Sequence, residues 1–153
     1  MAGPTFSTGV ADAGLTLSDS ADARTVTQFR HALSHWLRAT IALDAVRFND
    51  VLLAVNEALT NAAEFAYAGQ NGSMTMHARY DDAGRALLVD VTDRGVWRVT
   101  DPESQSNTRG RGIPLMEALA DRTTISALPS GTEVRLQFSD CAPVSAQPCA
   151  TPA

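Results

Sequence analysis

The sequence predicts a single α/β domain, because segments with apolar residues at helical spacing are followed by segments in which apolar and polar residues alternate. The chain has 153 residues, a length that fits one domain. Apolar residues make up 44% of it, which is enough for a core. We expect a loose lead-in over residues 1–14, the folded domain over residues 15–138 and a disordered tail over residues 139–153, where Pro, Ala and Ser dominate.

The N-terminal half of the domain is expected to be mainly helical. After a short strand at residues 15–17, apolar spacings of three and four predict helices over residues 21–39 and about 49–67. The N-cap of the first helix is expected at one of three polar residues, Ser18, Asp19 or Ser20. The core stripe of the second helix is expected to consist of Leu52, Val55, Leu59, Ala62 and Ala66.

The C-terminal half is expected to contain two β-hairpins. Four segments of period two pair as residues 72–80 with 86–93 and as residues 123–128 with 132–138. Between the hairpins, residues 94–111 form a polar connection of a length typical of functional lids or disordered loops. A third, short helix begins near Pro114, a favoured first-turn residue.

Charge and composition exclude several classes of function. The net charge is −5 and there is no long basic run, which argues against direct nucleic-acid binding and against a polybasic membrane patch. No apolar stretch is long enough to span a membrane, and the N-terminus lacks the features of a secretory signal. Cys141 and Cys149 lie in the predicted tail, where a disulfide would constrain little. We therefore expect a cytoplasmic protein.

The second helix carries a polar pair that could form part of a site. Glu57 and Asn61 are four residues apart and share one helix face, roughly opposite the apolar stripe. Ala54 and Ala58 lie beside them and leave room for a ligand. Asn is a poor residue for a helix interior, because its amide competes for backbone hydrogen bonds. The alternative is an ordinary solvated face.

Two predicted strand faces end in a polar side chain. The apolar face of the strand over residues 86–93 ends in Asp93, and that of the last strand begins with Thr132. A buried carboxylate needs a partner, because burying it unpaired costs several kcal/mol. The alternative is that both strands simply end there in water.

Glycines precede the third helix. Gly95 lies two residues after Asp93, where the strand ends. A second glycine-containing run lies just before Pro114: Arg109, Gly110, Arg111 and Gly112. Glycines before a helix N-terminus expose backbone N–H groups, and the helix dipole adds positive potential, so the run suits a phosphate. A flexible lid hinge is the alternative. The run matches neither a Walker A loop nor the Rossmann fingerprint.

Taken in order, these features resemble the GHKL (Bergerat-fold) ATPases, and among them the small anti-sigma-factor serine/threonine kinases. The resembling segments are residues 56–63 for the N box, 93–95 for the G1 box, 110–112 for the G2 box and 131–134 for the G3 element. The resemblance spans residues 15–138. It implies a two-layer α/β sandwich in which a mixed, mostly antiparallel sheet is covered on one face by helices.

The resemblance also implies a site that binds ATP with Mg²⁺. In it Glu57 is the general base, Asn61 is the Mg²⁺ ligand, and Asp93 accepts from the adenine amino group with the support of Thr132. The other residues implied to contact the nucleotide are Gly95, Arg109, Gly110, Arg111 and Gly112.

The implied partners are an anti-anti-sigma (STAS) protein, phosphorylated on Ser or Thr, and a sigma factor held by a homodimer of this chain. Two departures from the family pattern, Phe65 in place of a frequent His and Trp97 in place of a Gly, favour an alternative, a non-catalytic nucleotide-binding module that sequesters its partner. Another alternative is a sensor-kinase domain acting on a separate histidine protein. His31 and His35 are not expected to accept phosphate, because their helix has no second helix to pair with.

Overall fold

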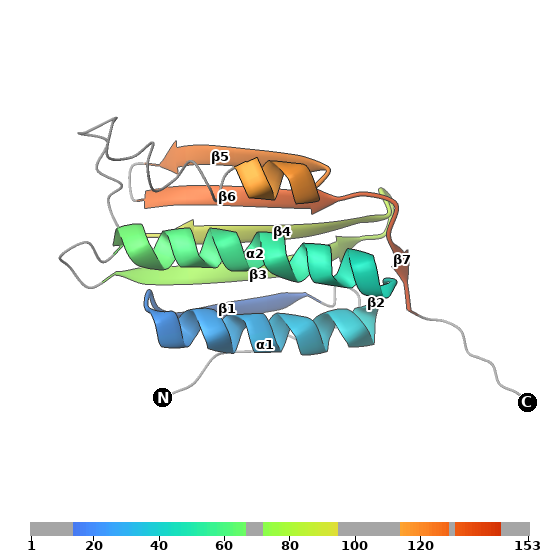
Figure 1. Cartoon of the computed structure of the whole chain (residues 1–153), viewed down its shortest axis with the longest axis horizontal. Helices are drawn as coiled ribbons and strands as arrows, with labels where there is room; N and C mark the ends of the chain where they lie inside the picture. The colour runs from blue at the N-terminus through green and yellow to red at the C-terminus, as the bar shows by residue number, and fades with distance from the viewer. Residues whose placement is uncertain (1–13, 67–71, 95–113, 129–130, 145–153) are drawn as a thin grey trace, which may run out of the picture.

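A five-stranded sheet and the helices packed on one of its faces make up the domain (Figure 1). The computed structural model describes residues 14–66, 72–94, 114–128 and 131–144. Residues 1–13 of the predicted lead-in and residues 145–153 of the predicted tail therefore lie outside the described residues. None of the described helices is long and apolar enough to cross a membrane.

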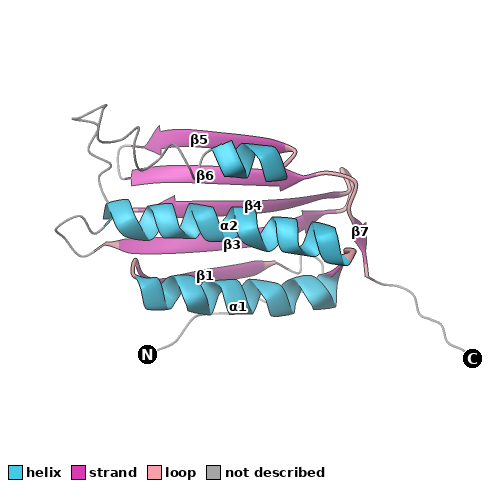
Figure 2. Cartoon of the chain, viewed as in Figure 1, coloured by secondary structure: helices cyan, strands magenta, loops and turns pink. Residues whose placement is uncertain are grey.

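The strands of the sheet follow the order β1-β3-β4-β6-β5, and each of the four pairings is antiparallel. This arrangement confirms the predicted mostly antiparallel sheet with helices on one face (Figure 2). The five strands are β1 (Leu15–Ser20), β3 (Ser73–Asp81), β4 (Ala86–Asp93), β5 (Arg122–Leu128) and β6 (Gly131–Phe138).

Two long helices, α1 (Ala23–Thr40) and α2 (Ala45–Ala66), cover the sheet, and residues 114–119 form the predicted third helix. Aspartates begin both long helices: Asp22 Oδ1 accepts from the Thr25 backbone N–H at 2.9 Å, and Asp44 Oδ1 accepts from that of Arg47 at 2.8 Å.

These caps correct two predicted boundaries. The first helix does not start after Ser18, Asp19 or Ser20, because β1 continues to Ser20 through its pairing with β3. The second helix starts at Ala45 and not near residue 49, because the cap at Asp44 allows an extra turn.

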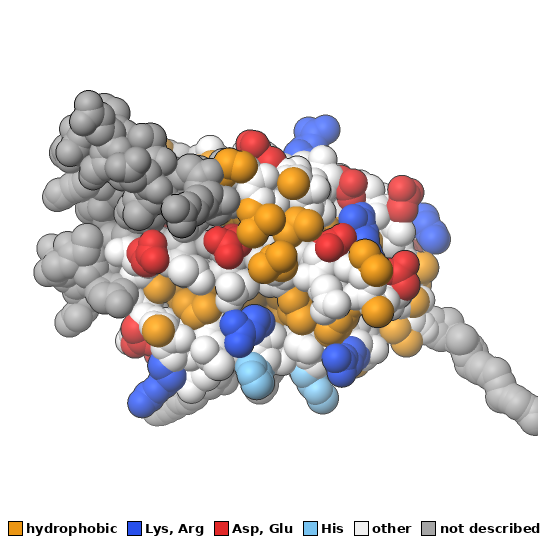
Figure 3. Space-filling model, in the orientation of Figure 1, with side chains coloured by type: hydrophobic (Ala, Val, Ile, Leu, Met, Phe, Trp, Pro, Cys, Tyr) orange, Lys and Arg blue, Asp and Glu red, His pale blue; other side chains and the backbone are white. Residues whose placement is uncertain are grey.

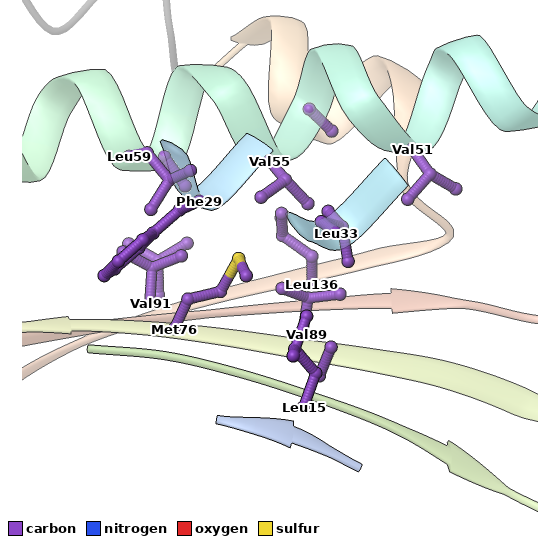
Figure 4. Close-up of a cluster of buried hydrophobic side chains, with 14 of the residues drawn as sticks. Leu15, Phe29, Leu33, Val51, Val55, Leu59, Met76, Val89, Val91 and Leu136 are labelled. Atoms are coloured by element: carbon purple, nitrogen blue, oxygen red, sulfur yellow. The ribbon is translucent and has the colours of Figure 1, made fainter. Parts of the chain in front are cut away.

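The core lies between the helices and the sheet (Figure 4). Phe29 and Leu33 of α1 meet the apolar face of the sheet, to which Met76 and Val89 belong. In the buried stripe of α2, Val51 takes the place predicted for Leu52. Val51 is fully buried, whereas Leu52 is only partly buried. Burial of each large side chain contributes about 1.5–3 kcal/mol, so this layer is the main source of stability.

The opposite face of the sheet is polar. Thr16 Oγ1 and His77 Nδ1 lie 2.7 Å apart across β1 and β3, and Arg135 of β6 forms a two-point ion pair with Asp90 of β4. This alternation of apolar and polar faces along each strand is the reason that the helices cover only one side.

The disordered tail predicted from residue 139 is wrong for its first six residues. Strand β7 (Ala142–Pro143) pairs with β2 (Ile41–Ala42), the short strand between the two long helices. Cys141 is 1% exposed, its backbone N–H donates to Arg85 O, and its carbonyl accepts from Tyr80 Oη at 2.7 Å. This strand could not be predicted from the sequence, because it is short and the composition around it is that of a linker.

Candidate nucleotide site

The predicted site residues that the structure describes lie near one end of the two layers. Asn61 lies in the last turns of α2, Asp93 is the last residue of β4, and Thr132 is the second residue of β6. In Figure 1 these element ends point to the same side of the molecule, on the left. Helix and sheet thus contribute polar side chains to the same end of the core.

Asp93 and Thr132 face each other across neighbouring strands. The register of β4 and β6 pairs them directly, and Met74 of β3 is the neighbour of Asp93 on the other side. Asp93 is 2% exposed and Thr132 is 4% exposed, although both lie at strand ends. The alternative that both groups are solvated is therefore wrong. Side chains directly opposite in an antiparallel pair are close enough to bind one ligand group together.

Gly131 allows the two strands to approach closely at this point. A Cβ atom added to Gly131 would lie 1.7 Å from the carbonyl oxygen of Asp93 and 3.0 Å from the Arg94 Cα atom. Any other residue would push the start of β6 away from the end of β4. Gly131 belongs to the segment that resembles the G3 element but was not predicted as a site residue. The signal for it was a glycine immediately before Thr132.

Asn61 is buried, so the alternative of a solvated face on α2 is wrong for this residue. It is 6% exposed, and its Nδ2 atom has no hydrogen-bond partner in the part of the chain that the structure describes. Ala54 and Ala58 are also buried on α2, whereas Glu57 is partly buried. The buried arc of the helix is wide because α2 packs against α1 as well as against the sheet.

The remaining predicted residues lie outside the described residues. This applies to Gly95, Arg109, Gly110, Arg111 and Gly112, and also to Trp97 and the side chain of Phe65. His31 and His35 are exposed on α1, and Figure 3 shows histidine side chains at the surface over that helix.

The residues that are described fit an adenine nucleotide and a hard cation. A buried carboxylate such as Asp93 can accept a hydrogen bond from an exocyclic amino group, and the Thr132 hydroxyl can both donate and accept. The amide oxygen of Asn61 is a ligand type that Mg²⁺ accepts, and its buried Nδ2 donor calls for an acceptor that the described residues do not supply.

This fold and arrangement of residues are those of a nucleotide-binding α/β domain with a helix-covered antiparallel sheet. The chain belongs to the family described as the histidine kinase-like ATPase domain, whose model matches residues 20–138. The match covers almost all of the predicted domain and confirms its resemblance to the GHKL superfamily. Membership of this family identifies the chain as a kinase-like domain that binds ATP.

Two solved structures are similar to this chain. The first is the crystal structure of the RsbU and RsbW domains of Rv1364c from Mycobacterium tuberculosis, with a TM-score of 0.65, 23% identity and 85% of this chain covered. The second is the histidine kinase domain of the EL346 blue-light activated histidine kinase from Erythrobacter litoralis, with a TM-score of 0.51, 21% identity and 61% covered. This chain spans only 33% and 44% of those two chains, and at these identities the likeness concerns the fold.

Proposed function

We propose that this protein is an anti-sigma factor that binds ATP with Mg²⁺ and phosphorylates a Ser or Thr of an anti-anti-sigma (STAS) protein. In the same proposal it acts as a cytoplasmic homodimer and sequesters a sigma factor while the STAS protein is phosphorylated. The single observation that carries the nucleotide site is the buried pair Asp93–Thr132, which lies at the same end of the core as the buried Asn61.

Each residue of the site has a separate task in this proposal. Asp93 and Thr132 bind the adenine ring, and Asn61 holds Mg²⁺ through its amide oxygen. Glu57, one helical turn before Asn61, accepts the proton of the incoming Ser or Thr hydroxyl. The bound ATP·Mg²⁺ supplies the γ-phosphoryl group and the positive charge that phosphoryl transfer needs.

The residues that would contact the phosphates are assigned from the family resemblance alone. Backbone N–H groups of Gly110 and Gly112 would approach the phosphates, and Arg109 or Arg111 would add positive charge. Gly95 would contact the nucleotide as part of the G1 element. Because phosphoryl transfer depends on position and charge stabilisation, these residues should affect turnover and nucleotide affinity together.

The fold comparisons favour the anti-sigma kinases over the histidine kinases. The RsbW-containing structure covers 85% of this chain at a TM-score of 0.65, against 61% and 0.51 for the histidine kinase domain. Acid treatment of the phosphorylated product separates the two, because phosphohistidine is lost in acid and phosphoserine survives. Survival of the label on the partner protein is the expected result.

A second candidate is a non-catalytic module that binds the nucleotide only as a conformational ligand. Phe65 and Trp97, the two departures from the family pattern, favour this function. A protein that binds ATP but labels no STAS partner would support the module over the kinase.

Calorimetric titration with ATP in the presence and absence of Mg²⁺ tests the site. We expect magnesium-dependent binding in the micromolar range or tighter, weakened by Asn61→Ala and weakened also by Asp93→Asn. Asn49→Ala is the matched control, because Asn49 is exposed on the same helix. Absence of binding at millimolar ATP would refute the proposed nucleotide site.

A further inference from the structure

The two long helices are joined by a directional contact next to the proposed base. Arg30 of α1 donates through Nη1 to Oδ1 of Asn56 on α2 at 3.0 Å, and the contact is partly buried. The two residues are 26 positions apart in the chain, so the hydrogen bond connects separate elements. Asn56 immediately precedes Glu57.

The apolar packing of α2 around Glu57 combines large and small side chains. Val55 and Leu59 are fully buried on either side of Glu57, and four further buried residues are alanines, Ala54, Ala58, Ala62 and Ala63. Apolar packing is non-directional, so a hydrogen bond adds an orientational constraint that this packing does not supply.

We propose that Arg30 is a positioning residue, which sets the direction of Glu57 by holding Asn56. Adjacent helical residues are related by a rotation of about 100° and a rise of about 1.5 Å. A fixed Asn56 side chain therefore fixes the direction in which Glu57 leaves the helix. This inference rests on the proposed function, since it assigns a task to the helix that carries the proposed base.

The charge of Arg30 fits this task better than a neutral donor would. A guanidinium group keeps its charge at all physiological pH values and presents its N–H donors in a rigid plane. Hydrogen bonds with one charged partner are also stronger than those between neutral groups. The contact thus adds a directional constraint to the non-directional apolar packing of α2.

The test compares Arg30→Met with Arg30→Lys. Methionine keeps most of the apolar stem and removes the donor, whereas lysine keeps a charged donor. We expect Arg30→Met to lower the turnover of phosphoryl transfer about tenfold, as a small misplacement of a reacting group does, and to leave the Kd for ATP within about twofold. Arg30→Lys should retain at least about half of the turnover, because one donor suffices for Asn56.

Arg38→Met is the matched control. Arg38 lies on the same helix and its guanidinium carbon lies 4.7 Å from the ring centroid of Phe48 on α2. Its contact with α2 is nine residues before Glu57, which is about 14 Å along the helix. We expect turnover close to that of the wild type.

A second readout needs no nucleotide. Three-bond couplings measured by NMR report the χ1 rotamer populations of a side chain, and we expect Arg30→Met to change them at Glu57 but not at the exposed Glu64. Unchanged populations at Glu57, full turnover in Arg30→Met, or an equal loss in Arg38→Met would each overturn the inference. If the wild-type protein binds ATP but transfers no phosphoryl group, the kinase proposal fails and this inference fails with it.

Discussion

The polar groups at the two ends of the helix–sheet sandwich lie in different environments. At the end formed by β2, β7 and the start of α2, the chain pairs its polar groups with one another. Arg47 donates to Asp121 Oδ2 at 2.6 Å and to the Ser139 carbonyl at 3.1 Å, and the Ser139 N–H donates to the same carboxylate at 2.7 Å. The Tyr80 hydroxyl donates to the carbonyl oxygen of Cys141 at the same end. We call this end the closed end.

At the opposite end, which we call the site end, three polar side chains of the described residues are buried. Asn61 is buried and keeps a donor without a partner among the described residues, and Asp93 and Thr132 are buried opposite each other. An unsatisfied buried group costs about 1–3 kcal/mol, so a folded chain retains it where a ligand supplies the missing partner. The contrast fits the proposed function, in which polar groups at the closed end stabilise the fold and those at the site end would bind the nucleotide.

The largest effect is expected at the site end, for Glu57→Ala. Loss of the proposed base should lower phosphoryl transfer about 100-fold or more, while most of the ATP affinity remains. Radiolabel transfer to the partner and calorimetry measure the two quantities. Glu64→Ala, an exposed carboxylate on the same helix, should leave both unchanged. A parental rate in Glu57→Ala would show that the base is assigned to the wrong residue.

Gly131→Ala should damage the shape of the site end. The added Cβ would lie 1.7 Å from a backbone oxygen of Asp93, which cannot move without separating β4 from β6. We expect a loss of about 3 kcal/mol in the free energy of unfolding, together with weaker ATP binding. Denaturant unfolding and calorimetry measure these losses.

Gly84→Ala is the control for this substitution. Its added Cβ would meet the carboxylate end of Asp81 at 2.7 Å, and a flexible side chain can turn aside. A small change in stability is therefore expected there. Equal costs at both glycines would refute the close approach of the strands as the reason for Gly131.

The comparison of the two ends also explains what the sequence could predict. Asp93 and Thr132 could be found, because strand periodicity places each at the end of an apolar face. Their mutual contact could not be derived from periodicity, since it depends on the register of β4 and β6, which are about 40 residues apart in the chain. The family resemblance supplied that pairing in place of a derivation.

The closed end could not be predicted at all. Its contacts depend on single long-range hydrogen bonds, such as that from Tyr80 to a backbone carbonyl of the segment expected to be disordered. The burial of Asn61 was missed for a related reason. Helical periodicity gives one apolar stripe, but α2 packs against both the sheet and α1, so its buried arc is wider than the stripe.

Tyr80→Phe tests whether the closed end is structural only. The substitution removes the hydrogen bond to the Cys141 carbonyl and keeps the ring, so the expected loss is about 1 kcal/mol in the free energy of unfolding. The affinity for ATP should not change. Weaker ATP binding in this variant would contradict the division of the molecule into two ends with separate tasks.

The smallest effect is expected for Asp121→Asn, and it should depend on pH. The Ser139 backbone N–H, followed by the Arg47 guanidinium, lowers the pKa of the Asp121 carboxyl below its ordinary value. A carboxyl with a lowered pKa in the folded state stabilises the protein above its unfolded pKa of about 3.9. That contribution is lost as the pH falls through the lower folded value.

The difference in the free energy of unfolding between wild type and Asp121→Asn should thus be constant from about pH 6 to 8 and shrink in acid below about pH 4. Because the Asp121 side chain is 46% exposed, we expect the difference to stay below about 1 kcal/mol. Denaturant unfolding at a series of pH values measures it. Added salt should weaken the part due to Arg47 more than the hydrogen bond from Ser139, since screening acts on the ion pair between side chains. A difference that grew in acid would mean that Asp121 is protonated more easily in the folded state, and the closed end would then resemble a site more than a structural junction.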